Sequence, residues 1–181
     1  MPIPTATIAV TNNALKIGDT SLVTFTFSEA VTGFSTADLT VPNGTVSSLS
    51  TADNITYTAT FTPSGSISDA TNLIVLDNTG VSAGGTPGVG TTESNNFAID
   101  TLRPTATIVV ANNALSAGET SLVTITFSEA VQNFTNADLT ISNGTLTSVA
   151  SGDGGVTWTA TLTPAAGISD TSNIITLDNT G

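Results

Sequence analysis

The stretch TSLVTFTFSEAV at residues 20–31 returns as TSLVTITFSEAV at residues 120–131. Within it, Val23, Phe25 and Phe27 alternate with threonine and serine, the pattern of a strand that buries one face. Because the motif starts at position 20 and again at position 120, the sequence predicts two copies of one structural unit.

The repeat extends along most of the chain. Further motifs recur: PTATI at 4–8 and 104–108, ADLT at 37–40 and 137–140, and LDNTG at 76–80 and 177–181. The last pair is displaced by one extra residue, because DGG at 153–155 stands where the first copy has DN at 53–54, and such an insertion predicts a surface turn. The second copy reaches Gly181, so within this sequence residues 81–100 have no counterpart.

Other segments show the same alternation of apolar and threonine residues, and each predicts a half-buried strand. The apolar sets are Ala6, Ile8 and Val10; Tyr57, Ala59 and Phe61; and Trp158, Ala160 and Leu162, with threonines predicted to face water. Shorter strands are expected around 39–41, 46–49, 73–76 and 97–99. We therefore predict an all-β fold of two tandem immunoglobulin-like antiparallel β-sandwiches with about seven strands each, at residues 1–100 and 101–181. A parallel β-helix is disfavoured, because no repeat of about 20 to 30 residues is visible.

The predicted boundaries carry two further expectations. Residues 81–93 are expected to form a long hairpin loop inside the first domain, and the junction at TLRP 101–104 to be extended and stiff, because proline restricts its own φ and its predecessor. The second domain is expected to lack its last strand and to expose a sheet edge, which would favour self-association through edge-strand pairing.

Composition excludes several classes of function. A net charge of −12 repels nucleic acid and anionic membranes, and no segment approaches a membrane span. The chain has no cysteine and no histidine, which removes disulfides, thiol nucleophiles and the commonest general base. Nothing marks a serine, threonine or carboxylate as catalytic, so we predict a protein that is not an enzyme. The opening MPIP is not expected to be a signal peptide.

Calcium is the metal that this composition could bind, because the ligands that it offers are hard oxygens. The candidate ligands are Asp100 at the junction; Glu29, Asp38, Asp69 and Asp77 in the first copy; and Glu129, Asp138, Asp170 and Asp178 in the second. The alternative is that these carboxylates are solvated turn residues, since no EF-hand loop is present. A structural calcium at Asp100 would bind in the weak range of extracellular modules, about 10⁻⁴ to 10⁻³ M.

Other residues could serve binding, and each has a structural interpretation. Tyr57 and Trp158 occupy equivalent inward positions and are predicted to be core residues rather than a carbohydrate platform. Phe34 and Phe134 come nearest to the loop aromatics expected of a binding module. The NGT motifs at 43–45 and 143–145 match a glycosylation acceptor, but Asn-Gly is also a preferred hairpin turn, and the turn is favoured. A repeat-wide isopeptide crosslink is excluded because the single lysine is not repeated.

The sequence resembles the bacterial Ig-like repeats of giant secreted RTX-type adhesins and biofilm-associated surface proteins. The resemblance covers nearly the whole chain and is strongest at residues 99–107, 121–131 and 153–161. It implies type I secretion, location at the bacterial cell surface, neighbouring Ig-like repeats, and a spacer role that is often stiffened by calcium at junctions. The loop AGGTPG at 83–88 departs from relatives that carry Asp and Asn there. The alternative function is a binding module whose loops contact a glycan, a host protein or a neighbouring copy.

Overall fold

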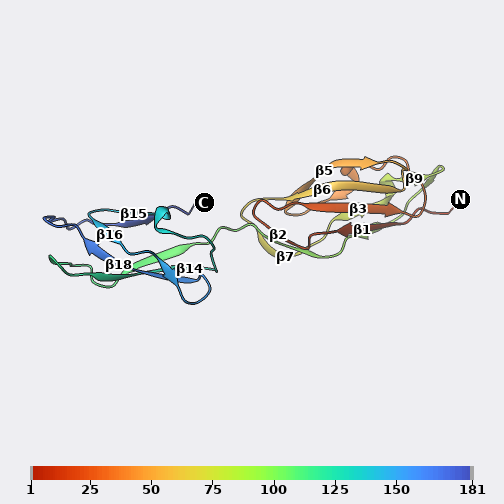
Figure 1. The fold of residues 1–181 in the computed structure, drawn as a ribbon. Helices are drawn as coiled ribbons and strands as arrows, with labels where there is room; N and C mark the ends of the chain where they lie inside the picture. Colours follow the sequence, from red (N-terminus) through yellow and green to blue (C-terminus); the bar gives the residue numbers. More distant parts are fainter. Residues whose placement is uncertain (1, 180–181) are drawn as a thin grey trace. The chain divides into compact units, whose positions relative to one another are not determined.

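A computed structural model describes residues 2–179, in which the regular secondary structure is almost entirely short strands (Figure 1). Contacts divide the chain between Arg103 and Pro104, inside the predicted junction, into a first unit and a second unit. The described helices are single 3-10 turns, and none in residues 2–179 has the length and apolar character to cross a membrane.

One sheet of the first unit has the strand order β1-β3-β6-β5. Its strands are β1 (Ala6–Val10), β3 (Ser21–Phe27), β6 (Thr56–Pro63) and β5 (Gly44–Thr51), and every pair is antiparallel. The register places Ile8 opposite Phe25 and Phe25 opposite Tyr57, so the apolar residues of three strands line one face, as the alternation predicts. On the other face, the threonines of β6 are less exposed than predicted, because Thr56, Thr58 and Thr60 are only partly accessible.

The opposing layer of the first unit is built from shorter strands. One group is β4 (Leu39–Thr40), β8 (Val75–Asp77) and β11 (Thr91–Glu93), and another is β2 (Ala14–Lys16), β12 (Phe97–Asp100) and β7 (Ser68–Asn72). In the second group β12 is central, parallel to β2 and antiparallel to β7. The two layers enclose one core, in which the rings of Phe61 and Phe97 meet edge to face with centroids 5.0 Å apart.

Residues 81–93 lie inside the first unit, as predicted, but they are not one loop, because Thr91–Glu93 form β11 and close a hairpin with β8. The two strands are paired antiparallel, and their connection contains the turn η2 (Asn78–Gly80) and a small hairpin of β9 (Ser82–Ala83) and β10 (Thr86–Pro87). The connection therefore has secondary structure of its own and belongs to the first unit.

The second unit repeats the first sheet closely. Its strands are β13 (Ala106–Val110), β14 (Ser121–Phe127), β18 (Thr157–Pro164) and β16 (Gly144–Leu146), with β17 (Ala150–Ser151) also paired to β18. The opposing layer holds β15 (Leu139–Ile141) and β19 (Ile175–Leu177). The buried residues of its core are Val123, Ile125, Phe127, Phe134 and Leu139, a smaller set than in the first unit.

The sequence predicts about seven strands per unit, and this number is wrong for the first unit, where the structure has β1 to β12 in the described residues. Among the additional strands are β2, which has only three residues, and β7, which is mostly polar, so neither shows a long alternation. The prediction that Asn43 and Gly44 form a hairpin turn is also wrong. Asn43 has a left-handed φ of 53°, but it connects β4, which pairs with β8, to β5, which pairs with β6. The turn therefore crosses between layers.

Candidate functional site

Asp38 and Asp138, two of the predicted calcium ligands, are capping residues. In η1 (Thr36–Asp38), Asp38 Oδ2 accepts hydrogen bonds from the Ser35 amide at 2.8 Å and the Ser35 hydroxyl at 3.1 Å, which forms a capping box. In η3 (Asn136–Asp138), Asp138 does the same with Thr135 at 2.8 and 3.2 Å. Both carboxylates hold the chain at the start of a turn.

Asp77, Asp69 and Asp170 each accept a hydrogen bond from the backbone amide two residues further along the chain. The hydroxyl and amide of Thr79 donate to Asp77 Oδ1 at 2.7 and 2.9 Å, and these bonds lower the Asp77 pKa. Asp170 accepts from the amide and hydroxyl of Ser172 at 2.9 and 2.8 Å, which lowers its pKa likewise. Asp69 accepts from the Thr71 amide, and it lies inside β7.

The remaining predicted ligands are scattered. Asp100 is exposed on β12, Glu129 and Asp178 are exposed, and Glu29 is partly buried with its Oε1 atom shielded from solvent and without a hydrogen-bond partner. Across residues 2–179, no three carboxylates come together in a group that could hold a metal ion. The described carboxylates therefore do not form a preformed calcium site, and calcium binding at Asp100 stays a prediction.

A carboxylate that the sequence did not single out, Asp153 in the turn before β18, accepts several hydrogen bonds. Its oxygens accept from the Ser151 hydroxyl at 2.9 Å and from the amides of Val156 and Thr157 at 3.2 and 2.9 Å. The backbone and side-chain bonds of Thr157 contribute most, and together the bonds lower the Asp153 pKa from 3.8 to about 2. Asp53 does the same for the equivalent turn of the first unit, and its pKa is lowered too, chiefly by the Thr56 amide. The signal was present in the sequence as an aspartate at a turn.

We expect the stability of the second unit to fall as the pH drops from about 4 toward 2. The folded-state pKa of Asp153 lies below its unfolded value, so its contribution is complete above the unfolded pKa and is lost as the pH falls through the folded one. Asp153→Asn should flatten this part of the pH profile. The measurement is the urea midpoint followed by the fluorescence of Trp158, the single tryptophan of the chain.

Asp53→Asn is the matched control, because it removes the equivalent carboxylate from the first unit and should leave the Trp158 transition unchanged. Superimposable pH profiles for the Asp153→Asn variant and the unmodified chain would contradict the assignment.

The aromatic residues considered for binding are part of the two cores. Tyr57 is buried, and Trp158, which is partly buried, donates from Nε1 to the Gly155 carbonyl at 3.0 Å. Phe134 is 8% exposed and meets the rings of Phe127 and Trp158 at 5.2 and 5.3 Å. Phe34 is partly buried and meets three rings in the first unit. Phe34 and Phe134, which came nearest to the loop aromatics of the alternative binding module, instead pack their rings against the cores.

Asn43 and Asn143, the asparagines of the two NGT motifs, have structural side chains. Asn43 Nδ2 donates to Asp69 Oδ2 at 3.0 Å and to Asn72 Oδ1 at 2.8 Å. Asn143 repeats this with Asp170 at 3.0 Å and Asn173 at 2.8 Å. A glycan on this nitrogen would compete with both bonds, which supports the turn interpretation.

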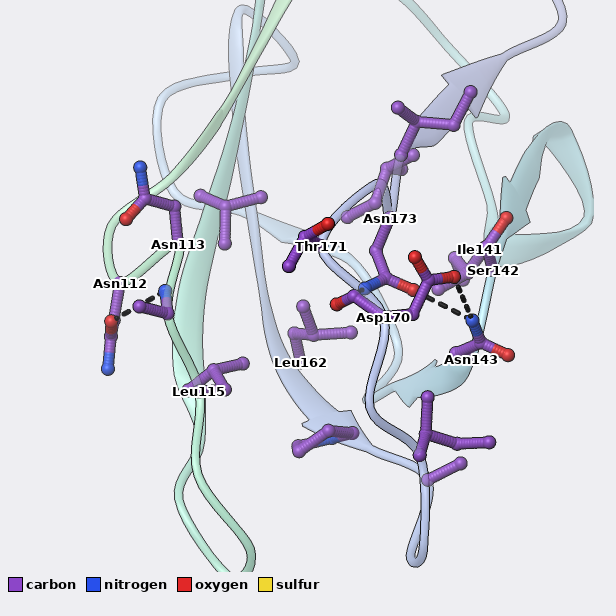
Figure 2. A pocket seen from close by; sticks show the side chains of 17 residues that line it. Asn112, Asn113, Leu115, Ile141, Ser142, Asn143, Leu162, Asp170, Thr171 and Asn173 are labelled. Carbon is purple, nitrogen blue, oxygen red and sulfur yellow. Dashed lines mark hydrogen bonds between the residues drawn. The ribbon is translucent and has the colours of Figure 1, made fainter.

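A groove of about 360 Å³ lies between the two layers of the second unit and is lined by both apolar and polar side chains (Figure 2). Aliphatic side chains form its floor and walls, among them Val110, Leu115, Ile141, Leu162 and Ile175. The Asn143–Asp170–Asn173 network lies along one side, where Figure 2 shows Asn143 and Asp170 facing each other beside Ser142.

Comparison with known protein families identifies the domain type of both units. A family described as "Bacterial Ig-like domain" matches residues 2–99 and again residues 100–181. No curated protein matches the sequence. Similar solved structures include the Escherichia coli adhesin FdeC (15% identity, 89% of this chain and 55% of that chain, TM-score 0.43) and the Yersinia pseudotuberculosis adhesin InvE (14%, 88% and 51%, 0.37). The chain thus spans about half the length of these structures.

Proposed function

Because the chain belongs to the bacterial Ig-like domain family in both of its repeats, we propose that it is a structural spacer of a bacterial surface adhesin, which holds a distal adhesive domain away from the cell. The observation that carries the proposal is the repetition itself. Each unit has its own hydrophobic core, so copies can be added in series, and the stability of such an array is close to a sum over its units.

The short junction supports a stiff connection. Thr101 is buried in the first unit, where its amide donates to the Ile67 carbonyl and its hydroxyl to the Ser64 carbonyl, both at 2.7 Å. Thr105 is held in the second unit by the Ser128 hydroxyl at 3.0 Å. Leu102, Arg103 and Pro104 lie between Thr101 and Thr105, and the proline restricts the backbone there.

An enzyme or a loop-binding module would need features that the described residues do not offer. The sequence has no histidine or cysteine, and the aromatic side chains considered for loop binding pack inward. The proposal is therefore a non-enzymatic protein whose role is to extend an adhesive domain from the cell. Secretion by a type I system, an RTX or biofilm-associated parent and a place outside the cell are part of the same proposal. They rest on the sequence motifs at residues 99–107, 121–131 and 153–161.

A stiff spacer predicts that the two units tumble together. We expect ¹⁵N relaxation to give both units the rotational correlation time of a single two-domain particle. The control variant carries about ten Gly and Ser residues inserted between Arg103 and Pro104, which should behave as a flexible coil and let each unit tumble separately. If the unmodified chain and the inserted variant relax alike, the stiff-spacer proposal fails.

The calcium hypothesis makes a separate prediction at the junction. If Asp100 helps to bind calcium, the melting temperature in excess calcium exceeds that in chelator, and Asp100→Asn removes the difference. Asp77→Asn, in a carboxylate that already accepts two bonds from Thr79, is the control for general charge effects. An unchanged melting temperature between calcium and chelator contradicts the hypothesis and leaves the spacer proposal intact.

A further inference from the structure

The fold requires asparagine at position 43. The backbone there has a left-handed φ of 53°, which asparagine, aspartate and glycine adopt more readily than other residues. The Asn43 amide nitrogen Nδ2 donates to Asp69 Oδ2 at 3.0 Å and to Asn72 Oδ1 at 2.8 Å. An aspartate carboxylate could donate neither bond, and glycine has no side chain. Of the residues suited to this backbone, asparagine is therefore the one that supplies both hydrogen bonds.

Packing requires glycine at the next position. A Cβ atom on Gly44 would lie 2.6 Å from the Thr62 carbonyl oxygen, which is too short for a carbon–oxygen contact. In the second unit a Cβ atom on Gly144 would lie 2.9 Å from the Thr163 carbonyl oxygen. Asn143 also has a left-handed φ, of 56°. The fold therefore imposes the dipeptide Asn-Gly at the same place in both units.

The Asn-Gly dipeptide is chemically labile, because glycine has no side chain to hinder attack by its own backbone nitrogen. The Gly44 nitrogen loses its proton and bonds to Cγ of Asn43. The bond between Cγ and Nδ2 then breaks, the leaving amide takes up the proton, and ammonia departs from a five-membered cyclic imide. Water adds to either imide carbonyl and breaks its bond to the Gly44 nitrogen, which gives aspartate or isoaspartate. Water is the co-reactant, and nothing is oxidised or reduced.

The native contacts of Asn43 oppose this reaction. The nitrogen that must leave is bound to two acceptors, and one of them, Asn72, is 1% exposed and is itself anchored to the Asp69 carbonyl at 3.1 Å. The Asn43 carbonyl accepts from the Ser64 amide at 2.8 Å, which fixes the peptide plane that must turn before the Gly44 nitrogen can reach Cγ. Cyclisation therefore requires this part of the unit to open, and its rate follows the open population.

The product of the reaction cannot restore the hydrogen bonds. Aspartate at position 43 would hold a carboxylate, which only accepts, against the Asp69 carboxylate and the Asn72 side-chain oxygen. Two carboxylates at such a distance repel each other. Isoaspartate would in addition lengthen the backbone where the chain passes from β4 to β5. Loss of the amide thus converts the link between this crossing and β7 into a repulsive contact.

We propose that Asn43 and Asn143 are sites of spontaneous deamidation, which the native contacts protect and which unfolding exposes. A unit that stays unfolded long enough to lose this amide refolds with permanently lower stability. The modification belongs to the repeat itself and does not depend on the spacer role.

The first test compares the full chain in native buffer with the full chain in urea, both at mildly alkaline pH. Tandem mass spectrometry follows the mass increase caused by replacing NH₂ with OH and assigns it to a residue. In urea, Asn43 and Asn143 should deamidate before Asn54 and Asn72, which precede isoleucine and leucine. In native buffer the Asn43 rate should be at least about 100-fold lower than in urea. An Asn43 that stays intact in urea, or equal rates in the two conditions, would overturn the proposal.

The second test removes one acceptor at a time. Asp69→Ala leaves Asn43 Nδ2 bound to Asn72 alone, and it should raise the native deamidation rate of Asn43 about tenfold, as expected for the loss of a hydrogen bond to a charged group. Asn143 is the internal control and should not change, because it lies in the other unit. Asp170→Ala is the reciprocal variant and should accelerate Asn143 alone. If neither variant accelerates the asparagine of its own unit, these contacts do not protect the site.

The third test measures the consequence for stability. Chain that has deamidated in urea and is then refolded should show a melting temperature of the first unit lower by about 5 °C or more than chain held in urea only briefly. Asn43→Asp provides the aspartate product in defined form and should show the same loss. Asn12→Asp is the matched control, because Asn12 contributes an acceptor, Oδ1, to the Ala14 amide at 3.1 Å, and a carboxylate can replace it. Equal melting temperatures for Asn43→Asp and Asn12→Asp would contradict the proposed destabilisation.

Discussion

Phe97→Ala is expected to lower the free energy of unfolding of the first unit by about 3–5 kcal/mol. The side chain is fully buried, and its removal leaves a cavity against the Phe61 ring, whose centroid is 5.0 Å away. It also weakens β12, the strand that joins β2 to β7, so the loss should spread to both neighbours. The measurement is differential scanning calorimetry, with Trp158 fluorescence identifying the transition of the second unit, which should not move.

Leu22→Ala is the control for Phe97→Ala. Leu22 is 51% exposed on β3 and lies outside the core, so its truncation should change stability by about 0.5 kcal/mol or less. If Phe97→Ala is as mild as Leu22→Ala, then β12 is dispensable to the first unit.

The alternating strands could be predicted because their pattern is local. In β3, Val23, Phe25 and Phe27 are buried as the spacing of two requires, and Val123, Ile125 and Phe127 repeat this in β14. Strands β2 and β7 could not be predicted in the same way. The burial of Leu15 in β2, for example, depends on β12, which lies about eighty residues further along the chain.

The site was predicted less well than the fold. The exposed sheet edge that the sequence predicts for the second unit stays a prediction, and residues 114–116 and 169–173, at the repeat positions of β2 and β7, are not strands there. The carboxylates were considered as calcium ligands, although Ser35 and Asp38, like Thr135 and Asp138, have the spacing of a capping box. Local hydrogen bonding explains these aspartates without a metal.

Phe134→Ala is expected to cost the second unit about 3–5 kcal/mol and to leave much of it unfolded near room temperature. Phe134 is one of five residues in the buried core cluster of that unit, and its ring links Phe127 to Trp158. The first unit distributes the same role over more rings, since Phe34 meets Phe25, Phe27 and Tyr57. Urea unfolding followed by Trp158 fluorescence measures the effect, and Leu122→Ala, at 51% exposure, is the control.

The result for Phe134→Ala also separates the two functions considered for these loops. A phenylalanine that serves a ligand is presented to solvent, and its truncation leaves the fold nearly unchanged. A phenylalanine that seals the end of a sandwich destabilises the unit when it is removed, because the cavity is not refilled. The edge-to-face contacts at 5.2 and 5.3 Å and the low exposure of Phe134 assign it to the second class. A Phe134→Ala variant with an unchanged urea midpoint would return this loop to the binding hypothesis.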